Sequence, residues 1–418
     1  MSKRDVLVGI DVGSSTVKTI IAQIISPEEK PRIIGVGVAP SAGVRKGIIV
    51  DLEEATQSIN RSLEEAERLA GVSVNRAVVS VGGNHIFSQY SKGVIAVGRA
   101  DGEVTEDDVE RVINAAQAIS IPPNKEIIHI IPKDYSLDDQ RNIKDPIGMN
   151  GVRLEVDACI IEGSTPYLRN LTKCVEQAGV AMDSFVLAPL AAARATLSKR
   201  QKELGVVLVD IGGGATSLAV FEENDLLHTA IVPLGGNHIT NDIAIGLRTS
   251  IDVAEKVKIN YGSALPDDIN KKDHINLAEI DPNEEGEISR HHVAEIIEAR
   301  LEEIFTMIDK ELRKTGRSGM LPAGALIVGG GAKLPGVVDL AKKVLRLPAQ
   351  TGFPLELGGI VDKVDEPGFV TAVGLALWGM EEMAAGSGKG RISAGIDSLP
   401  KMGQTVDKMK GWLRKFLP

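Results

Sequence analysis

The sequence predicts an α/β protein with two similar lobes, because one short pattern occurs twice and a related pattern occurs a third time. Two glycine-rich turns each lie between two apolar runs of the kind that forms strands: Asp11-Val12-Gly13-Ser14-Ser15-Thr16 and Asp210-Ile211-Gly212-Gly213-Gly214-Ala215. A third apolar run, Leu326-Ile327-Val328, leads into Gly329-Gly330-Gly331. We therefore expect each lobe to contain a strand, an acidic residue, a glycine-rich turn and a second strand.

Such turns suit a phosphate group. Successive backbone N–H groups in a turn form a concave site for anions, and glycine lets the backbone come close. The two helix-opening phosphate motifs, G-x-x-x-x-G-K-[ST] and G-x-G-x-x-G before a helix, are absent from the sequence. A single glycine turn would more often close an ordinary hairpin. Three turns, two of them with matched aspartates, favour ATP held between the lobes.

The acidic residues suit a metal ion. Asp11 and Asp210 stand where their strands end, so both carboxylates are expected in one cleft. Mg²⁺ prefers oxygen ligands and keeps several waters. We therefore predict Mg²⁺ as well as ATP, with Asp11 and Asp210 as metal-binding and catalytic residues and Lys18 close enough to reach a phosphate.

Composition narrows the classes further. A chain of 418 residues should form two domains or one large bilobal body. A net charge of −10 and an aromatic content of 3% argue against a nucleic-acid partner. The spacing of Cys159 and Cys174 matches no metal or redox motif and fits a reducing cytosol. No apolar run of about 18 residues predicts a membrane span, and the first residues do not resemble a signal peptide.

The first half of the chain divides into a lobe and an insertion. Residues 5–40 read as three strands with turns at Gly13 and Pro27, followed by a helix over 51–70 and a strand over 76–81. From 84 to 162 the pattern changes to a small α+β unit. Its expected elements are strands at 93–97, 126–131 and 154–161 and a helix at 106–118.

The second half begins with a helix over 167–178 and a segment, 186–193, that should cross between lobes. The second lobe opens at Gly205. The remaining expectations are long helices over 235–262 and 289–316, a polar surface loop over 263–288, and helices over 335–345 and 369–379.

The end of the chain has a different character. Residues 386–403 hold five glycines and read as a flexible linker. Residues 404–418 predict a helix with basic residues around one apolar face, as in helices that lie on a membrane surface. The apolar face consists of Val406, Met409, Trp412, Leu413, Phe416 and Leu417.

From residue 386 onward the charge balance is +5, whereas the rest of the chain carries −15, so we expect binding to anionic lipid. One copy would bind weakly and an array firmly, which suggests a polymer. The alternative is that this helix packs on its own body, as amphipathic helices usually do.

Several longer segments carry a family resemblance, among them VGIDVGSSTVKTIIA, SVGGNHI, PLGGNHITNDIAIGLRTSIDVAEKVK and VGGGAKLPGV. They resemble the actin-fold ATPases and, over nearly the whole chain, the FtsA family of bacterial cell-division proteins. The resemblance implies a bilobal actin-like (ribonuclease-H-like) fold with an inserted α+β subdomain and a C-terminal amphipathic helix on a flexible linker. The implied parts are a first lobe (1–83, 163–198 and 370–385), an insert for filament contacts (84–162), a second lobe (199–238 and 311–369), its small subdomain (239–310), a linker (386–403) and a membrane helix (404–418).

The resemblance also implies partners and a location. Such a protein would bind ATP, form filaments of its own copies and tether the ring of the tubulin-like protein FtsZ to the inner face of the cytoplasmic membrane at the division site. It would also help to recruit later division proteins. The C-terminal tail of FtsZ would bind the small subdomain, where Arg290 and Arg300 are candidates to meet its acidic residues. The alternative is that both arginines are simply solvated helix surface.

The resemblance carries a nucleotide site over to this chain, part by part. The phosphates would be held by Gly13, Ser14, Ser15, Thr16, Lys18, Gly212, Gly213, Gly214, Ala215 and Thr216. The ribose and adenine would be flanked by Gly235, Gly236, Glu255 and Lys258, and the adenosine would be covered by Gly329, Gly330, Gly331, Ala332 and Lys333.

One segment departs from the family pattern. The second phosphate turn usually reads DIGGGTTD, but here it reads DIGGGATS. Ser217 therefore stands in place of an acid near the position of the attacking water, and serine is a poor base at neutral pH. We expect Ser217 to be the catalytic-site residue that limits turnover, so that ATP binds tightly and is hydrolysed slowly or not at all.

Three other classes share part of this pattern. An actin-fold small-molecule kinase would need a catalytic acid in the first lobe, which we do not identify, and no membrane tail. A chaperone-type motor would need a further peptide-binding domain. A pilus-assembly ATP-binding relative would share the body but typically lacks the tethered amphipathic end.

Overall fold

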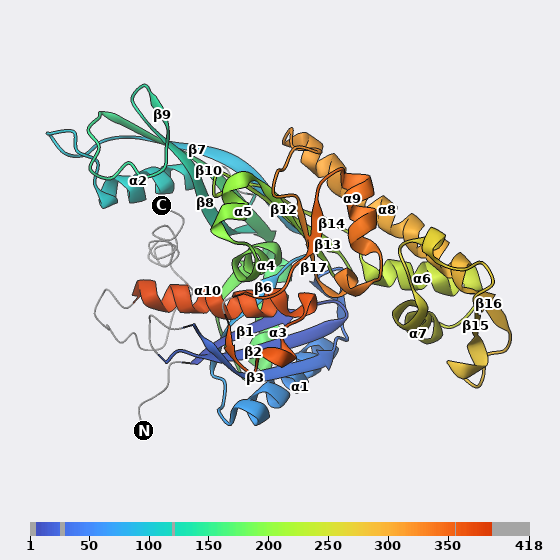
Figure 1. Ribbon diagram of the computed structural model, residues 1–418. Helices are drawn as coiled ribbons and strands as arrows, with labels where there is room; N and C mark the ends of the chain where they lie inside the picture. The colour runs from blue at the N-terminus through green and yellow to red at the C-terminus, as the bar shows by residue number, and fades with distance from the viewer. Residues whose placement is uncertain (1–5, 26–29, 119–121, 356, 387–418) are drawn as a thin grey trace.

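The computed structural model describes residues 6–25, 30–118, 122–355 and 357–386. Two lobes, each built around a β-sheet, lie next to one another, and a smaller unit extends from each (Figure 1). The first-lobe sheet contains β1 (Val6–Val12), β2 (Thr16–Gln23), β3 (Arg32–Pro40), β6 (Arg76–Val81), β11 (Ala181–Leu187) and β19 (Gly358–Gly359). The second-lobe sheet contains β12 (Val206–Ile211), β13 (Thr216–Glu222), β14 (Asp225–Val232), β17 (Ala325–Val328) and β18 (Ala349–Thr351).

The two sheets repeat one topology. The order β3-β2-β1-β6-β11 in the first lobe corresponds to β14-β13-β12-β17-β18 in the second. In each sheet three antiparallel strands are followed by two parallel ones. The sequence pattern missed β11 and β14, but its central expectation, an α/β protein of two similar lobes, is confirmed.

The central strands are apolar because both faces of each sheet are covered. In β12, every residue except Asp210 is buried, as expected for a strand enclosed on two sides. Helix α1 (Leu52–Ala70) lies against the first sheet. It begins at Asp51, whose carboxylate accepts from the Glu54 N–H, and ends at Gly71 in the left-handed region. Its bounds match the prediction.

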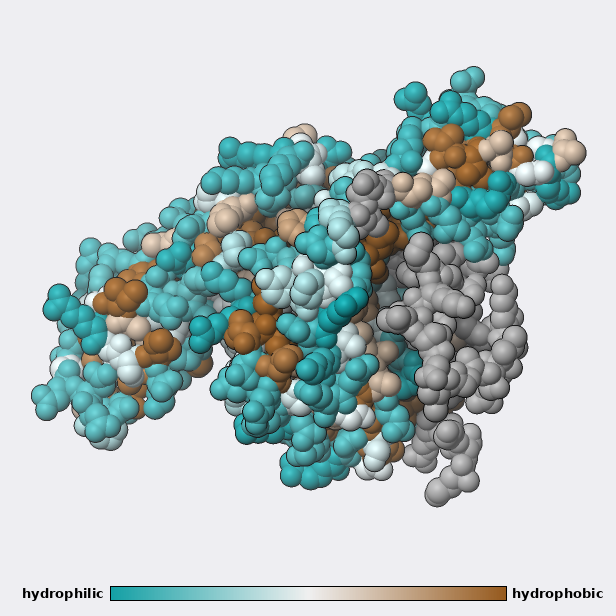
Figure 2. Space-filling view, turned by 180° about the vertical axis from the view of Figure 1, so that it is seen from behind, coloured by the Kyte–Doolittle hydropathy of each residue, from teal (hydrophilic) through white to brown (hydrophobic). Residues whose placement is uncertain are grey.

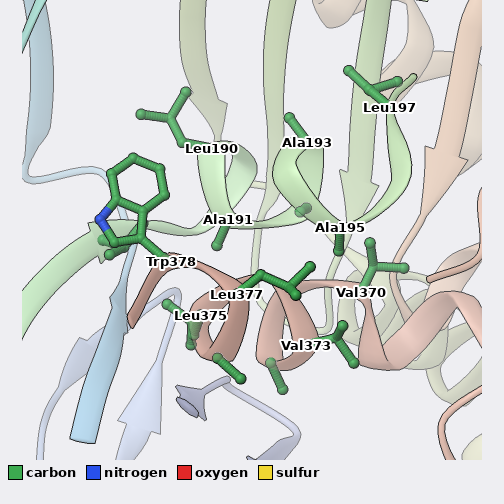
Figure 3. Close-up of a cluster of buried hydrophobic side chains, with 14 of the residues drawn as sticks. Leu190, Ala191, Ala193, Ala195, Leu197, Val370, Val373, Leu375, Leu377 and Trp378 are labelled. Carbon is green, nitrogen blue, oxygen red and sulfur yellow. The ribbon is translucent and has the colours of Figure 1, made fainter. Parts of the chain in front are cut away.

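Two helices pack against each other where the lobes join. Figure 3 shows Ala191 of α4 (Ala188–Thr196) pointing toward α10 (Val370–Gly386), which carries Leu377. The helices touch at Gly374, where a Cβ atom would lie 1.8 Å from the carbonyl oxygen of Ala191. The predicted crossing segment is thus a short helix in the core shared by both lobes.

The insert has its own sheet and core. The sheet has the strand order β7-β10-β8-β9, and the insert also contains one helix. These elements are β7 (Ile86–Ala96), α2 (Glu106–Gln117), β8 (Lys125–Leu137), β9 (Gln140–Ile143) and β10 (Arg153–Ser164). The strands are longer than predicted, because the parts of β7 and β8 that the prediction omitted mix polar with apolar residues and carry no continuous apolar run. Buried residues such as Val112 and Leu154 form a separate cluster beneath α2.

The structure of the small subdomain differs from the prediction in two places. The single helix predicted over 235–262 is wrong: the chain forms α6 (Gly236–Leu247) and α7 (Ile251–Tyr261), because Arg248 adopts a φ of 57° and ends the first helix. The loop predicted over 263–288 contains a strand, β15 (His274–Asn276), which pairs with β16 (Glu287–Ser289). Helix α8 (Arg290–Lys314) is confirmed, with its whole predicted apolar stripe buried.

The remaining elements connect these parts. They are β4 (Val44–Arg45), β5 (Ile48–Ile49), α3 (Thr165–Gln177), α5 (Lys199–Leu204) and α9 (Val337–Leu345). The surface seen in Figure 2 carries hydrophobic residues in separate patches rather than in one continuous band. Within the described ranges, no helix is both long and apolar enough to pass through a bilayer. The predicted linker, from 387 onward, and the predicted membrane helix lie outside the described residues.

Candidate functional site

A cleft of about 650 Å³ lies where the turns of the two lobes meet. It is bordered by the β1–β2 and β12–β13 turns, the glycine turn after β17, and α6 and α7. The predicted site residues that line it are Asp11, Gly13, Ser14, Ser15, Thr16, Lys18, Asp210, Gly212, Gly213, Gly214, Ala215, Ser217, Gly236, Glu255, Lys258, Gly329, Gly330, Gly331 and Lys333.

Three predicted residues do not line the cleft. The hydroxyl of Thr216 is buried and donates to the carbonyl oxygen of Leu234 at 2.8 Å. Gly235 packs against the carbonyl oxygen of Gly212, and Ala332 is buried. These residues support the cleft from behind.

The two aspartates occupy equivalent positions in the two hairpins. Asp11 pairs with Lys18 across the first hairpin, and Asp210 pairs with Ser217 across the second. The lysine of the first lobe therefore corresponds to the serine of the second. The cleft has a cation beside one carboxylate and a small neutral hydroxyl beside the other.

Each carboxylate is held by a hydroxyl group from a distant part of the chain. Ser80 Oγ accepts from the Val12 N–H at 3.0 Å and donates to Asp11 Oδ1 at 2.8 Å. Thr371 Oγ1 donates to Asp210 Oδ2 at 3.3 Å. These contacts orient both carboxylates before any ligand arrives.

Both carboxylates have a pKa above that of an ordinary aspartate. Burial and, to a lesser extent, the charge of Asp11 raise the pKa of Asp210 to about 6, against the opposing influence of Lys18 and the Thr371 hydrogen bond. Burial likewise raises the pKa of Asp11, against the influence of Lys18 and the Ser80 hydrogen bond. Two partly desolvated carboxylates with one nearby ammonium form a site that a divalent cation would stabilise.

The two phosphate turns touch across the cleft. A Cβ atom on Gly213 would lie 1.9 Å from Ser15 Oγ, and one on Gly214 would lie 2.6 Å from Ser14 Oγ. Ser15 Oγ also donates to Asn237 Oδ1 of the second lobe at 2.9 Å. Glycine is therefore required at both positions for the lobes to approach this closely.

The third turn brings backbone against a carboxylate. Gly329 adopts a φ of 84°, and a Cβ atom there would lie 2.3 Å from Asp210 Oδ1. At Gly330, the next residue, nothing lies within 4 Å of such an atom. Gly329 therefore requires glycine, both for its backbone conformation and because there is no room for a side chain, whereas Gly330 has room for one.

Charged pairs form the far walls. Lys258 Nζ lies 2.6 Å from Glu255 Oε2 and donates to Thr240 Oγ1 at 2.8 Å. Lys333, in the glycine turn after β17, pairs with Glu366. Each of the two lysines therefore has a carboxylate partner at the wall of the cleft.

Sequence reasoning missed several residues of the cleft. Ser80 and Gly82 lie within the segment SVGGNHI, which was noted for its resemblance but not as part of the site. Thr371 was assigned only to a closing helix, and Asn237 to a helix start. No local motif marks these residues, because they reach the cleft only through the fold.

The two predicted partner-binding arginines lie on α8, away from the cleft. Arg300 forms a two-pronged pair with Asp242, with N–O distances of 2.6 and 2.9 Å. Arg290 Nε donates to the carbonyl oxygen of Tyr261 at 3.0 Å. Both side chains have partners within the subdomain, and their role toward another protein stays a prediction.

Known proteins resemble this chain along nearly its whole length. The family described as "Cell division protein FtsA" matches residues 207–374, and the "SHS2 domain inserted in FTSA" matches residues 83–162. The cell division protein FtsA of Pseudomonas aeruginosa is 36% identical over 98% of this chain and 97% of its own length. That of Bacillus subtilis is 42% identical over 90% of this chain and 83% of its own length.

Solved structures agree on the fold. A PilM-PilN type IV pilus biogenesis complex matches with a TM-score of 0.66 at 18% identity, over 90% of this chain and 98% of that one. MreB 5 of Spiroplasma citri bound to AMPPNP matches with a TM-score of 0.54 at 13% identity, over 93% of this chain and all of that one. With its actin-like fold, its inserted domain and relatives of this identity, the chain belongs to the FtsA family of cell division proteins.

Proposed function

We propose that this chain binds ATP with Mg²⁺ between its lobes, forms filaments and tethers a division ring of FtsZ to the inner face of the cytoplasmic membrane. The observation that carries the nucleotide part is the cleft itself, where Asp11 and Asp210 share Lys18 beside glycine turns from both lobes. Membership of a cell-division family supports the wider role.

The residues of the cleft fit this ligand. A volume of about 650 Å³ lies within the usual range for a ligand site, roughly 300–1,000 Å³. Mg²⁺ is commonly held by one or two carboxylates together with the phosphates of its nucleotide. Among the described residues no group of three or more His, Cys, Asp or Glu could hold a metal.

Each part of the chain then has a distinct task. Mg²⁺ would neutralise phosphate charge and would be bound, directly or through water, by Asp11 and Asp210. Lys18 would add a positive charge next to the phosphates. The turns at Gly13 and Gly212 would present backbone N–H groups to the phosphate oxygens.

Ser217 points to slow chemistry. It lies opposite Asp210 in the hairpin and lines the cleft, so it could hold a water molecule. A serine hydroxyl is a weak base, and general-base assistance typically contributes 10²–10⁴-fold to rate. We expect the nucleotide to act mainly by closing the lobes.

Binding and turnover can be measured separately. Titration of the full chain with a fluorescent ATP analogue should show binding that requires Mg²⁺, and Asp11→Asn should weaken it by at least about tenfold, or about 1.4 kcal/mol. Steady-state phosphate release should stay far below one per second. No binding would contradict the proposed ligand, and release of several per second would contradict the role given to Ser217.

The proposed FtsZ site can be tested on α8. Arg290→Glu should weaken binding of the acidic C-terminal peptide of FtsZ, because it replaces an attracting charge with a repelling one. Arg313→Glu is a matched control at the other end of the same helix, where Arg313 pairs with Asp309. Equal losses in both variants would point to general charge attraction and against a site at Arg290.

The alternative of a pilus-assembly protein has fold support from PilM alone. The relatives at 36% and 42% identity are both cell division proteins. The kinase alternative has no observation in its favour. Neither is proposed.

A further inference from the structure

A buried histidine lies at the joint between the first lobe and the insert. His85 stands between the last residue of β6 and the first of β7. Its carbonyl oxygen accepts from the N–H of Ser164, where the chain leaves the insert, at 3.3 Å. Its ring packs against that of Tyr167 of α3 in a tilted arrangement, with 5.0 Å between ring centroids and 43° between ring planes. The residue therefore ties the incoming strand, the outgoing strand and the lobe together.

The ring of His85 lacks a hydrogen-bond partner within the part of the chain that the structure describes. Its side chain is only 6% exposed, and neither Nδ1 nor Nε2 is hydrogen-bonded. Buried polar atoms almost always have a partner, and ordered water is the usual one when protein supplies none. Burial lowers the pKa of His85 to about 4, so the neutral ring keeps one donor and one acceptor nitrogen.

A small cavity adjoins the ring. It measures about 10 Å³, which is about the room that one water molecule needs. Of the ten residues that line it, only Ser80, His85 and Tyr167 have polar side chains. The cavity is therefore polar where Ser80, His85 and Tyr167 meet it, and the other lining residues are valine, isoleucine, leucine and glycine.

The cavity shares a wall with the nucleotide cleft. The residues that line both are Val12, Gly47, Ser80 and Gly82. Ser80 Oγ donates to Asp11 and accepts from the Val12 N–H, which leaves one lone pair for a further donor. A second link runs through Gly47, whose N–H donates to Ser14 Oγ and whose backbone abuts Gly83.

We propose that the cavity binds one ordered water between His85 and Ser80, and that His85 thereby acts as a positioning residue that couples the Asp11 side of the cleft to the insert. The water donates one proton to Ser80 Oγ and the other to the unprotonated ring nitrogen of His85. A change in the position or charge of Asp11 then alters the packing around His85, between the first lobe and the insert. This inference rests on the proposed nucleotide function, because Asp11 must respond to a ligand.

Hydrogen exchange on the full chain tests the coupling. Amide exchange over residues 82–87 and 163–167 is compared with and without Mg·ATP, and Mg·ATP affinity is measured alongside. Wild type should show slower exchange in both segments when nucleotide is bound. His85→Phe should lose most of that difference while its affinity stays within about threefold of wild type.

Two further variants separate positioning from packing. His85→Gln should restore most of the response, because its amide can still bind the water. Tyr167→Phe keeps the ring against His85 and should behave like wild type. A nucleotide response in His85→Phe equal to that of wild type would overturn the proposal.

Two other outcomes are distinct. If wild type binds no Mg·ATP, the proposed function fails. If wild type binds Mg·ATP but amide exchange over residues 82–87 and 163–167 does not change, the proposed function stands and this inference fails. A crystal structure of the wild-type chain provides a measurement that needs no variant: a water peak within hydrogen-bond distance of His85 and Ser80 is expected, and an empty cavity would contradict the proposal.

Discussion

At the scale of single residues, the cleft shows what local sequence can and cannot reveal. Asp11 and Asp210 were predictable because each ends an apolar run before a glycine turn. Their hydroxyl partners were not, because Ser80 lies 69 positions from Asp11 and Thr371 lies 161 positions from Asp210. Local patterns identify a charged group, whereas the groups that orient it come from other elements of the fold.

The raised pKa of Asp210 makes a prediction about stability. A carboxyl pKa of about 6 in the folded protein, against 3.8 for an ordinary aspartate, means that folding favours the protonated form. The contribution of the Asp210 carboxyl to the free energy of unfolding is therefore fully present below pH 3.8 and is lost as the pH rises through 6. Asp210→Asn should raise the free energy of unfolding of the nucleotide-free protein at pH 7.5 by roughly 1–3 kcal/mol.

The gain should shrink at pH 4.5, where wild-type Asp210 is itself largely protonated. Denaturant unfolding at both pH values measures it. The same variant should lose the Mg²⁺ dependence of ATP binding. An equal gain at pH 4.5 and 7.5 would show that the charge of Asp210 is not the cause.

The glycine turn after β17 offers a matched pair of substitutions. Gly329→Ala should cost roughly 1–3 kcal/mol of stability, because it places a Cβ at a positive φ and against Asp210. Gly330→Ala has open space and should change stability by less than about 0.5 kcal/mol. Thermal unfolding of both variants checks this, and similar melting temperatures would contradict the assigned role of Gly329.

At the scale of elements, regular apolar periodicity predicted a helix correctly, whereas several ends of helices and strands carry no clear local signal and were predicted wrongly. Helix α8 was predictable over its length because six apolar residues recur at helical spacing, from Val293 to Leu312. The break between α6 and α7 was not, because Arg248 adopts a left-handed conformation that usually marks glycine or asparagine. Strands β7 and β8 were predicted too short, since the parts that the prediction omitted carry no continuous apolar run.

Lys144 forms an ion pair between the insert and the second lobe, in addition to the hydrogen bonds that Ser88 and Tyr90 donate to carbonyl oxygens of β14. Lys144 Nζ donates to Asp134 at 2.9 Å within the insert and pairs with Asp225 at the start of β14. Burial raises the pKa of Asp225 to about 6, against the influence of Lys144. Removing Lys144 would leave two neighbouring carboxylates without their shared cation.

Lys144→Met should therefore lower stability at pH 7.5 by roughly 1–3 kcal/mol and speed proteolysis of the insert. The loss should be smaller at pH 5, where Asp225 takes up a proton. Lys133→Met is the control, because Lys133 lies 3.9 Å from Asp134 and lowers the pKa of Asp225 less than Lys144 does. If both variants behave alike, the bridge to the second lobe contributes nothing specific.

At the scale of the whole molecule, the repeated hairpin made the bilobal fold predictable. Two turns with matched aspartates indicated two lobes and a ligand between them, and the paired sheets confirm the lobes. The contact between the turns could not be predicted, since it depends on how α4 and α10 join the lobes. The sheet pairing of β11 and β14 likewise follows from tertiary packing rather than from local pattern.

The predicted membrane tail allows a test on the intact chain. Deleting residues 404–418 should abolish sedimentation with vesicles that contain anionic lipid, because six large apolar side chains and several basic residues are lost. Trp412→Glu should have a similar effect. If the truncated chain still sediments with vesicles, the tail is not the membrane anchor.

The most direct measurement of the central claim is a crystal structure of the full chain with Mg²⁺ and AMPPNP. The predicted result is a nucleotide whose phosphates lie between the turns at Gly13 and Gly212, with Asp11 and Asp210 on opposite sides of the metal and bound to it directly or through water. A nucleotide bound elsewhere, or a metal that contacts neither aspartate nor a water held by one, would contradict the account.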